Sequence, residues 1–323
     1  MSVYPFRSNS IDQFASRLFR AQNNRQEFDQ LLGRVLFPVP KWNIEQADTG
    51  QYYLKYDAGG MHHNSEGLGD GLISLLFIVD ALYDSGDNDM IVIDEPELSL
   101  HPSLQRKLSS LLIEYSSIRQ IVVATHSPYF LELPTLEAGA RVARVHQTTA
   151  GSVISELTVE TGKSFQGFLN DTHNPHVWGL NAKEVFFLDD GIILVEGQDD
   201  VIHYPRLAIK LGIQFQGTFF GWGVGGAQKM KLIAKTLKEL GFQKVAGILD
   251  RNCDQISKEL QKEFPDYSFF TIPANDVRTK KASPAKPEII GLTDEYENIR
   301  PEYSESFKKL VQKINSIVAP QLT

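Results

Sequence analysis

The chain has 323 residues, a hydrophobic fraction of 42% and a formal net charge of −8. This length favours two domains over one, and the negative charge argues against a protein that coats nucleic acid through bulk positive charge. Cys253 is the only cysteine, which excludes a disulfide framework and a cysteine zinc site and fits a reducing compartment. The longest apolar run, residues 72–79 with Ser74 tolerated, is far shorter than the roughly 20 residues of a membrane span, so we expect a cytoplasmic protein with no membrane partner.

Strands and helices alternate along the first half of the chain. Apolar residues recur with helical spacing over residues 11–35, and shorter strand-like and helical runs follow. Apolar strands that alternate with helices indicate a parallel sheet covered on both faces. The predicted elements are a helix within 11–35, a strand at 51–56, a helix at 67–83, a strand at 90–93, a helix at 102–115, a strand at 120–124 and a small antiparallel pair within 140–160.

A second alternation of strands and helices begins near residue 189 and predicts a compact second domain. We therefore expect a first domain over 1–160, a connector over 161–188 and a second domain over 189–323. The basic, proline-containing stretch 278–287 is predicted to be an exposed loop. The elements expected in the second domain are strands at 191–195, 217–220, 245–249 and 268–272 and helices at 200–211, 227–240 and 257–264.

Two carboxylates, Asp94 and Glu95, stand at the end of the apolar strand 90–93. Nucleotide hydrolysis is the commonest chemistry that places two acids there. In such a site Asp94 holds Mg²⁺, directly or through water, and Glu95 polarises the attacking water.

Polar residues at two other places support the same chemistry. Ser65 and Gly67 lie at the start of a predicted helix, where a hydroxyl and backbone N–H groups can meet a phosphate. His126 follows the strand 120–124, where its side chain can hydrogen-bond a γ-phosphate and the attacking water.

The run 98–102 (LSLHP) follows the two acids directly. In this order the features resemble the signature motif, Walker B motif, D-loop and H-loop of ABC-type ATPases, particularly the SMC/Rad50-like branch. The resemblance covers about residues 50–135 and implies the C-terminal portion of an ABC-type ATPase domain in a homodimer or higher even-numbered oligomer. Glu66 separates serine from glycine, unlike the usual Ser-Gly-Gly form. The resemblance assigns Ser65 and Gly67 to ATP bound by the opposite protomer, and Asp94, Glu95 and His126 to the protomer's own ATP.

A G-x-x-x-x-G-K-[ST] phosphate loop is absent from the sequence. Without its backbone N–H groups and lysine around the phosphates, tight ATP binding by this chain alone is not expected. The chain is then either the C-terminal part of a longer protein, with ATP at a site completed by a phosphate loop outside it, or a degenerate ATPase fold kept for dimerisation. The presence of Asp94, Glu95 and His126 favours the first alternative.

A second group of acids follows two apolar strands of the second domain. Glu196 ends the first strand and Asp200 lies four residues later, while Asp250 ends the second strand with Asn252 and Asp254 behind it. Ligands in open α/β sheets bind at the carboxyl ends of the strands, so two neighbouring parallel strands bring these acids together. Three carboxyl groups suit Mg²⁺ or Mn²⁺.

This arrangement resembles the Toprim domain of topoisomerases, primases and certain nucleases. The resemblance implies that Glu196 is a metal ligand or general base and that Asp250 is the first aspartate of the Asp-x-Asp motif. Asn252 stands where the second aspartate belongs, and its amide oxygen can still ligate a metal, although it carries no charge. Asp254 is the alternative source of that charge. The glycine-rich run 221–226 is interpreted as turn chemistry.

The order of an ATPase portion and a Toprim-like domain resembles the OLD (overcoming lysogenization defect) family of ATP-dependent nucleases, including those of anti-phage defence systems. The resemblance covers most of residues 50–290 and implies DNA as a partner, with an accessory defence protein as a further possible one. In that family a lysine after the last Toprim strand stabilises the transition-state phosphate. Lys280 and Lys281 are the candidates here, with Arg278 next.

These features predict a metal-dependent DNA endonuclease regulated by an ABC-type ATPase module. Glu196, Asp200 and Asp250 hold one or two metal ions, one ion activates water and another steadies the leaving 3′ oxygen. A lysine adds positive charge at the transition state. The alternative is a catalytically dead ATPase-fold scaffold that dimerises and binds a partner. A topoisomerase or primase is disfavoured, because no domain with a nucleophilic tyrosine is evident and a primase does not normally follow an ABC-type half.

Overall fold

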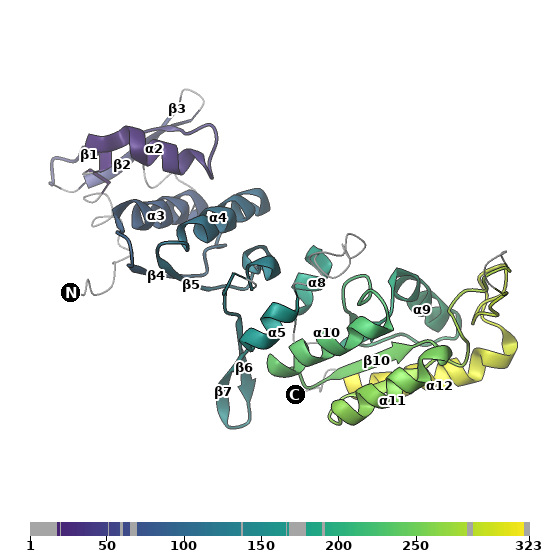
Figure 1. Ribbon diagram of the computed structural model, residues 1–323. Helices are drawn as coiled ribbons and strands as arrows, with labels where there is room; N and C mark the ends of the chain where they lie inside the picture. The colour runs from purple at the N-terminus through teal and green to yellow at the C-terminus, as the bar shows by residue number, and fades with distance from the viewer. Residues whose placement is uncertain are drawn as a thin grey trace. The chain divides into compact units, whose positions relative to one another are not determined.

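The computed structural model describes residues 18–19, 21–50, 52–58, 61–64, 70–136, 138–165, 167, 179–188, 191–282 and 287–319. The chain divides into two compact units, Met1–Phe130 and Leu131–Thr323 (Figure 1). Both units combine helices with parallel strands, which confirms the predicted α/β class. Within the described ranges, no helix has the length and apolar character needed to cross a membrane.

The described part of the first unit contains an antiparallel sheet and a parallel pair of strands. Strands β1, β2 and β3 are antiparallel in that order, and β4 and β5 run parallel. Helices α2, α3 and α4 share one apolar core with these strands. The bounds are β1 Lys41–Gln46, β2 Tyr52–Ala58, β3 Met61–Asn64, β4 Met90–Asp94, β5 Gln120–Ala124, α2 Arg25–Gly33, α3 Asp70–Asp84 and α4 Pro102–Tyr115, with short 3₁₀ turns at Gln22–Asn24 and Pro128–Phe130.

Among the described residues, the parallel pair β4–β5 is covered on one face only. Ile91 and Ile93 are buried in the core with α3 and α4, because alternate residues of a strand point to opposite faces. On the other face Met90 and Val92 are 61% and 67% exposed, and Val122 of β5 is also exposed. Parallel strands are usually buried on both faces, so this face is unusually bare.

The second unit is built on a four-stranded parallel sheet with the order β11-β10-β8-β9. Its strands are β8 Ile192–Val195, β9 Thr218–Phe219, β10 Val245–Leu249 and β11 Ser268–Thr271, and its longer helices are α9 Gln198–Lys210, α10 Ala227–Glu239, α11 Asp254–Glu263 and α12 Pro301–Val318. An antiparallel hairpin and shorter helices precede the sheet. They are β6 Ala143–Thr148, β7 Gly151–Glu156, α5 Val159–Ser164 and α8 Leu180–Val185, with 3₁₀ turns at Leu133–Leu136 and Arg251–Cys253.

Helices cover both faces of this sheet, and for that reason β8 and β10 are buried along their whole length (Figure 1). Leu194 and Leu249 share a core with residues of α10 and α11. Ile193 and Ile248 point the other way and share a core with residues of α9 and α12. Continuous apolar strands are typical of such doubly covered parallel sheets.

The described residues of the predicted connector 161–188 contribute to the core of the second unit. Phe165, Ala182 and Phe186 are buried in the cluster that also contains residues of β8 and α10. The boundary between the compact units therefore falls after Phe130, upstream of the hairpin β6–β7. The functional division at residues 160 and 188 stays a prediction.

Candidate metal and nucleotide sites

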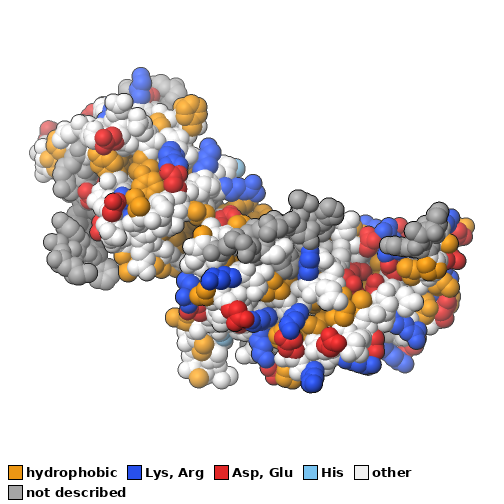
Figure 2. Space-filling model, in the orientation of Figure 1, with side chains coloured by type: hydrophobic (Ala, Val, Ile, Leu, Met, Phe, Trp, Pro, Cys, Tyr) orange, Lys and Arg blue, Asp and Glu red, His pale blue; other side chains and the backbone are white. Residues whose placement is uncertain are grey.

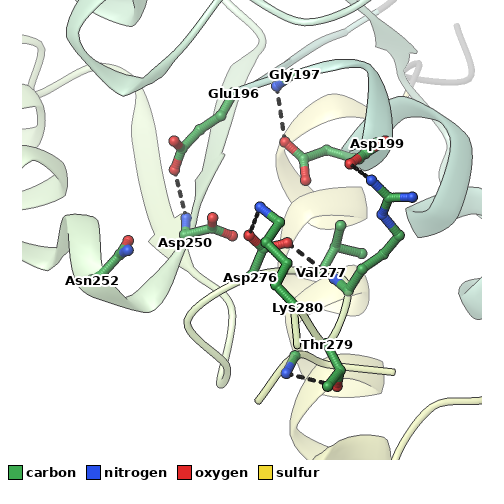
Figure 3. A network of polar contacts seen from close by, with 12 residues as sticks. Glu196, Gly197, Asp199, Asp250, Asn252, Asp276, Val277, Thr279 and Lys280 are labelled. Atoms are coloured by element: carbon green, nitrogen blue, oxygen red, sulfur yellow. Dashed lines mark hydrogen bonds and ion pairs between the residues drawn. The ribbon is translucent and has the colours of Figure 1, made fainter. Parts of the chain in front are cut away.

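Glu196 and Asp250 meet at the carboxyl end of the second unit's sheet. Each follows the last residue of a buried strand, and the two strands are parallel neighbours with Val195 opposite Ile248. Glu196 Oε1 accepts a hydrogen bond from the backbone N–H of Asp250 at 2.8 Å (Figure 3). The pairing of β8 with β10 thus brings the two acids together.

Asp200 lies in the first turn of α9, above the end of β8. Its Oδ2 accepts a hydrogen bond from the backbone N–H of Gly197 at 2.9 Å, and the residue is only 7% exposed. The buried hydroxyl of Tyr204, one turn later, also hydrogen-bonds Asp200. Both bonds fix the carboxyl group close to Glu196.

Asp276 is a fourth acid of this group, and it was not among the predicted site residues. It is buried, and its Oδ1 accepts a hydrogen bond from the backbone N–H of Arg278 at 3.1 Å. Lys280 forms an ion pair with its Oδ2 (Figure 3). The signal in the sequence is an acid shortly after a third strand, β11, which is parallel to β10 and therefore ends at the same edge of the sheet.

Burial and mutual repulsion raise the pKa of two of these carboxyl groups. Burial raises the pKa of Asp250 to about 8, and the charges of Glu196, Asp200 and Asp276 add to the effect while Lys280 opposes it. Burial also raises the pKa of Asp200 to about 7, with Glu196 and Asp276 adding and the hydrogen bond from Gly197 opposing. At neutral pH the group therefore holds protons that a bound cation can displace.

The donor set fits a hard divalent cation such as Mg²⁺ or Mn²⁺. Oxygen ligands are those that these ions prefer, and the buried Asp250 Oδ1 has no hydrogen-bond partner in the structure. Among the described residues, no three His, Cys, Asp or Glu side chains already stand in a metal-ligand arrangement. Glu196 is engaged by the Asp250 N–H and Asp276 by Lys280, so side-chain rearrangement has to accompany metal binding.

The remaining predicted residues of this site lie apart from the four acids. Asn252 is exposed in the turn after Asp250 (Figure 3). Asp254 is the first residue of α11 and pairs with Lys258 at 2.6 Å. The structure thus does not bring Asn252 and Asp254 to the other acids.

The two predicted lysines differ in their surroundings. Lys280 reaches Asp276, and its backbone pairs with that of Ile289 in both directions at 2.9 Å. Lys281 is exposed and has no recorded contact among the described residues. Arg278 forms an ion pair with Asp199 in the first turn of α9. Of the two lysines, only Lys280 is held at the acid group.

The glycine-rich turn after β9 supports the backbone at Glu196. The backbone N–H groups of Gly225 and Gly226 donate to the Glu196 carbonyl oxygen at 3.0 and 2.8 Å. A Cβ atom at Gly223 would lie 2.6 Å from the Gly197 Cα, and Gly223 has a φ of +91°, which favours glycine. The turn therefore positions the first acid of the site.

In the first unit, Asp94 and Glu95 stand at the tip of β4 beside the end of β5. Glu95 adopts a φ of +47°, unusual for a residue with a side chain, and its N–H donates to the Ala124 carbonyl at 2.8 Å. His126 Nε2 lies 4.0 Å from Glu95 Oε1 on a side chain that is 87% exposed. Ser65 and Gly67, the other predicted residues of this site, lie outside the described residues.

Glu97 joins the tips of β4 and β5, a role that the sequence motifs did not suggest. Its carboxylate accepts hydrogen bonds from Thr125 Oγ1 and from the His126 backbone N–H, both at 2.6 Å. Charge-assisted bonds of this kind are stronger than neutral ones. Glu97 thereby holds the backbone that presents His126.

Comparison with known proteins relates the first unit to AAA-type ATPase domains. Residues 8–132 match the family described as "AAA domain, putative AbiEii toxin, Type IV TA system". The chain is also similar to Endonuclease GajA of Bacillus cereus (strain VD045), with 35% identity over 215 residues that form 65% of this chain and 34% of that protein. The chain therefore matches about a third of the length of this relative.

Solved structures of Smc head domains also align with the chain. One is bound to the C-winged helix domain of ScpA, and the alignment has 16% identity, a TM-score of 0.36 and coverage of 50% of this chain and 53% of that chain. Another, derived from Pyrococcus furiosus, has 16% identity, a TM-score of 0.36 and coverage of 48% and 39%.

Proposed function

We propose that the protein is a metal-dependent DNA endonuclease controlled by an ABC-type ATPase module and acting in anti-phage defence. The observation that carries the proposal is the group of four acids at the end of the second unit's sheet, in which two carboxyl groups have raised pKa values. A divalent cation neutralises such a group and is the usual reagent for phosphodiester hydrolysis. The similarity to Endonuclease GajA supports a nuclease, and the Toprim-like assignment of the second unit is part of the proposal.

Each acid has a role in this proposal. Glu196, Asp200 and Asp250 hold one or two Mg²⁺ or Mn²⁺ ions, and Asp276 adds a further oxygen donor. When bound, the cation supplies Lewis-acid activation of water and charge at the leaving oxygen. Glu196 also accepts a proton as general base. Lys280 places an ammonium group where negative charge develops on the phosphate.

The first unit supplies control through ATP. Asp94, Glu95 and His126 serve a nucleotide whose phosphates are held by a phosphate loop outside this sequence, and Mg²⁺ accompanies it. Ser65 and Gly67 contact the ATP of an opposite protomer in a homodimer or larger even-numbered assembly. The match of residues 8–132 to an AAA domain supports nucleotide binding.

The bare face of β4–β5 favours a second candidate function. Met90, Val92 and Val122 expose apolar side chains on a parallel pair, which is a surface suited to a protein partner. A catalytically dead ATPase-fold scaffold that dimerises and binds an accessory defence protein uses such a surface. The acids of the second unit have no role in this alternative.

Nicking of supercoiled plasmid separates the two functions. The chain is incubated with plasmid and Mg²⁺ or Mn²⁺ and compared with Glu196→Ala and with the matched control Asp266→Ala, an exposed acid that pairs with Lys238. The endonuclease proposal predicts nicking by the native chain and the control, and none by Glu196→Ala. Equal nicking by all three proteins would show that the activity does not come from this site, and nicking by none would favour the scaffold.

A further inference from the structure

An open groove follows the outer edge of the second unit's sheet. Strand β11 is last in the strand order, and residues of α11 and α12 line the groove beside it. Two depressions of about 520 and 430 Å³ share Thr271, Ser306 and Leu310, so they form one continuous groove. None of the four site acids lines it.

The backbone of β11 offers a hydrogen-bond donor to this groove. Because Ile272 N donates to β10, the alternation of the strand turns the polar groups of Phe269 and Thr271 toward the open edge. Gln261 of α11 covers the first part, since its side chain accepts from Phe269 N at 3.1 Å and donates to Tyr267 O at 2.8 Å. Thr271 N has no recorded partner among the described residues.

The groove is positively charged, although the chain as a whole has a net charge of −8. Lys and Arg side chains lie along the part of the surface where α11 and α12 run (Figure 2). Lys313 lines one depression and Arg251 the other, and neither has an ion-pair partner among the described residues. The charged residues that line the groove are Arg251, Lys258, Lys309 and Lys313, against Asp254 and Glu302. Lys258 pairs with Asp254 and Lys309 with Glu305, so the unpaired positive charge comes from Arg251 and Lys313.

One end of the groove lies next to the acid group in the chain. Arg251 directly follows Asp250, and Pro273 precedes Asp276 by three residues. Along α12 the lining residues extend from Lys313 to Glu302, a rise of about 16 Å at 1.5 Å per residue. This length matches roughly five nucleotides of one strand of a duplex, at about 3.4 Å each.

We propose that this groove binds the sugar-phosphate backbone of a DNA strand and leads it to the acid group. The inference rests on the proposed endonuclease function. Lysine and arginine side chains and a free backbone N–H are the donors that bind phosphate oxygens without reading sequence. An added protein strand fits less well, because Gln261 already occupies the hydrogen-bonding positions of Tyr267 and Phe269.

Fluorescence anisotropy of a labelled 30-base-pair duplex, measured with the full chain in EDTA so that no cleavage occurs, tests the groove. The test variant is Lys309→Glu/Lys313→Glu, and Lys309→Gln/Lys313→Gln removes the charge more mildly. The matched control is Lys231→Glu/Lys235→Glu on α10, where both lysines pair with glutamates outside the groove. Circular dichroism melting establishes that each variant is folded.

We expect the groove variants to bind DNA about tenfold or more weakly, with the salt slope of log K reduced by about 2 in magnitude for the two lost contacts. The α10 control stays within about twofold of the native chain. Native affinity in both groove variants would overturn the proposal, as would an equal loss in the α10 control. If the native chain binds DNA through the groove but never nicks it, the endonuclease proposal fails while the groove stands. If the native chain nicks DNA and the groove variants bind DNA normally, the groove proposal is wrong while the endonuclease proposal stands.

Discussion

The backbone N–H of Asp250 donates a 2.8 Å hydrogen bond to Glu196 Oε1, which joins the carboxyl ends of β10 and β8. The same approach places the two carboxyl groups near each other, and the charge of Glu196 contributes to the raised pKa of Asp250 after the larger effect of burial. Asp250 Oδ1 is buried and has no hydrogen-bond partner in the part of the chain that the structure describes. The backbone therefore fixes two acids in a position where their charges repel each other unless a cation is bound.

Replacement of Asp250 by asparagine tests this repulsion. At pH 9, where Asp250 is ionised because its pKa is about 8, Asp250→Asn removes one charge from a buried group. The metal-free chain should then melt about 2–4 °C higher, the shift that roughly 1 kcal/mol produces in a protein of this size. Plasmid nicking should be lost in the same variant. Thermal melts in EDTA provide the measurement, with Asp266→Asn, an exposed acid, as the control that leaves both properties unchanged. A lower melting temperature for Asp250→Asn would contradict the repulsion.

The raised pKa values of Asp200 and Asp250 also predict how stability depends on pH. Each carboxyl group has a folded pKa of about 7 or 8, above the value of about 4 in an unfolded chain, so the folded state binds more protons between these values. The metal-free chain should therefore lose stability as pH rises from about 5 to 8. Urea unfolding in EDTA at several pH values measures this trend. Asp250→Asn should make the loss of stability with rising pH less steep. An unchanged slope in that variant would contradict the contribution of Asp250 to this trend.

Lys280 and Lys281 form a matched pair for testing the transition-state charge. Lys280 is paired with Asp276, whereas Lys281 is exposed with no recorded contact among the described residues. Lys280→Met should reduce the nicking rate by about 10²–10³, as does loss of one preorganised donor in other hydrolases. Lys281→Met should stay close to the native rate. Single-turnover rates on plasmid decide between them, and the opposite ranking would move the role to Lys281.

A comparison of alanine variants at Gly223 and Gly212 distinguishes the cost of a steric clash from the cost of the left-handed backbone conformation. Both have positive φ, but a Cβ at Gly223 meets the Gly197 backbone at 2.6 Å, whereas a Cβ at Gly212 has nothing within 4 Å. Gly212→Ala should cost about 1–2 kcal/mol from the left-handed conformation. Gly223→Ala should cost about 1–3 kcal/mol more and also lower nicking, because it displaces the turn that carries Glu196. Equal unfolding free energies for the two variants would contradict this packing.

Much of the fold follows from local patterns in the sequence. The strands β4, β5, β8 and β10 end within one residue of their predicted ends, because each is a short apolar run followed by a polar turn. Helix α12 was not predicted, although Phe307, Leu310, Val311 and Ile314 recur at helical spacing after Pro301 and are buried. Residues 161–188 were predicted to be a connector, and the local pattern gave no sign that Phe165 and Phe186 are buried. Their burial depends on contacts with strands that are distant in the sequence.

The candidate site was less accessible from sequence alone. Glu196 and Asp250 could be found because each ends an apolar strand, and parallel pairing brings such ends together. Asp276 follows β11 only after several loop residues, and its proximity depends on where that loop turns back. Asn252 and Asp254 match the spacing of a motif, but Asn252 lies in the turn at Arg251–Cys253 and Asp254 pairs with Lys258 in α11.

Calorimetric titration of the chain with Mn²⁺ tests the central claim most directly, since it reports the metal site without requiring cleavage. The native chain should bind Mn²⁺ and release protons near pH 7, because Asp200 and Asp250 hold protons there that the metal displaces. Titrations in two buffers of different ionisation enthalpy measure this release. Glu196→Ala and Asp250→Asn should lose the binding, while Asp266→Asn keeps it. Binding of equal strength in all four proteins, or no binding by the native chain, would contradict a metal-dependent nuclease site at these acids.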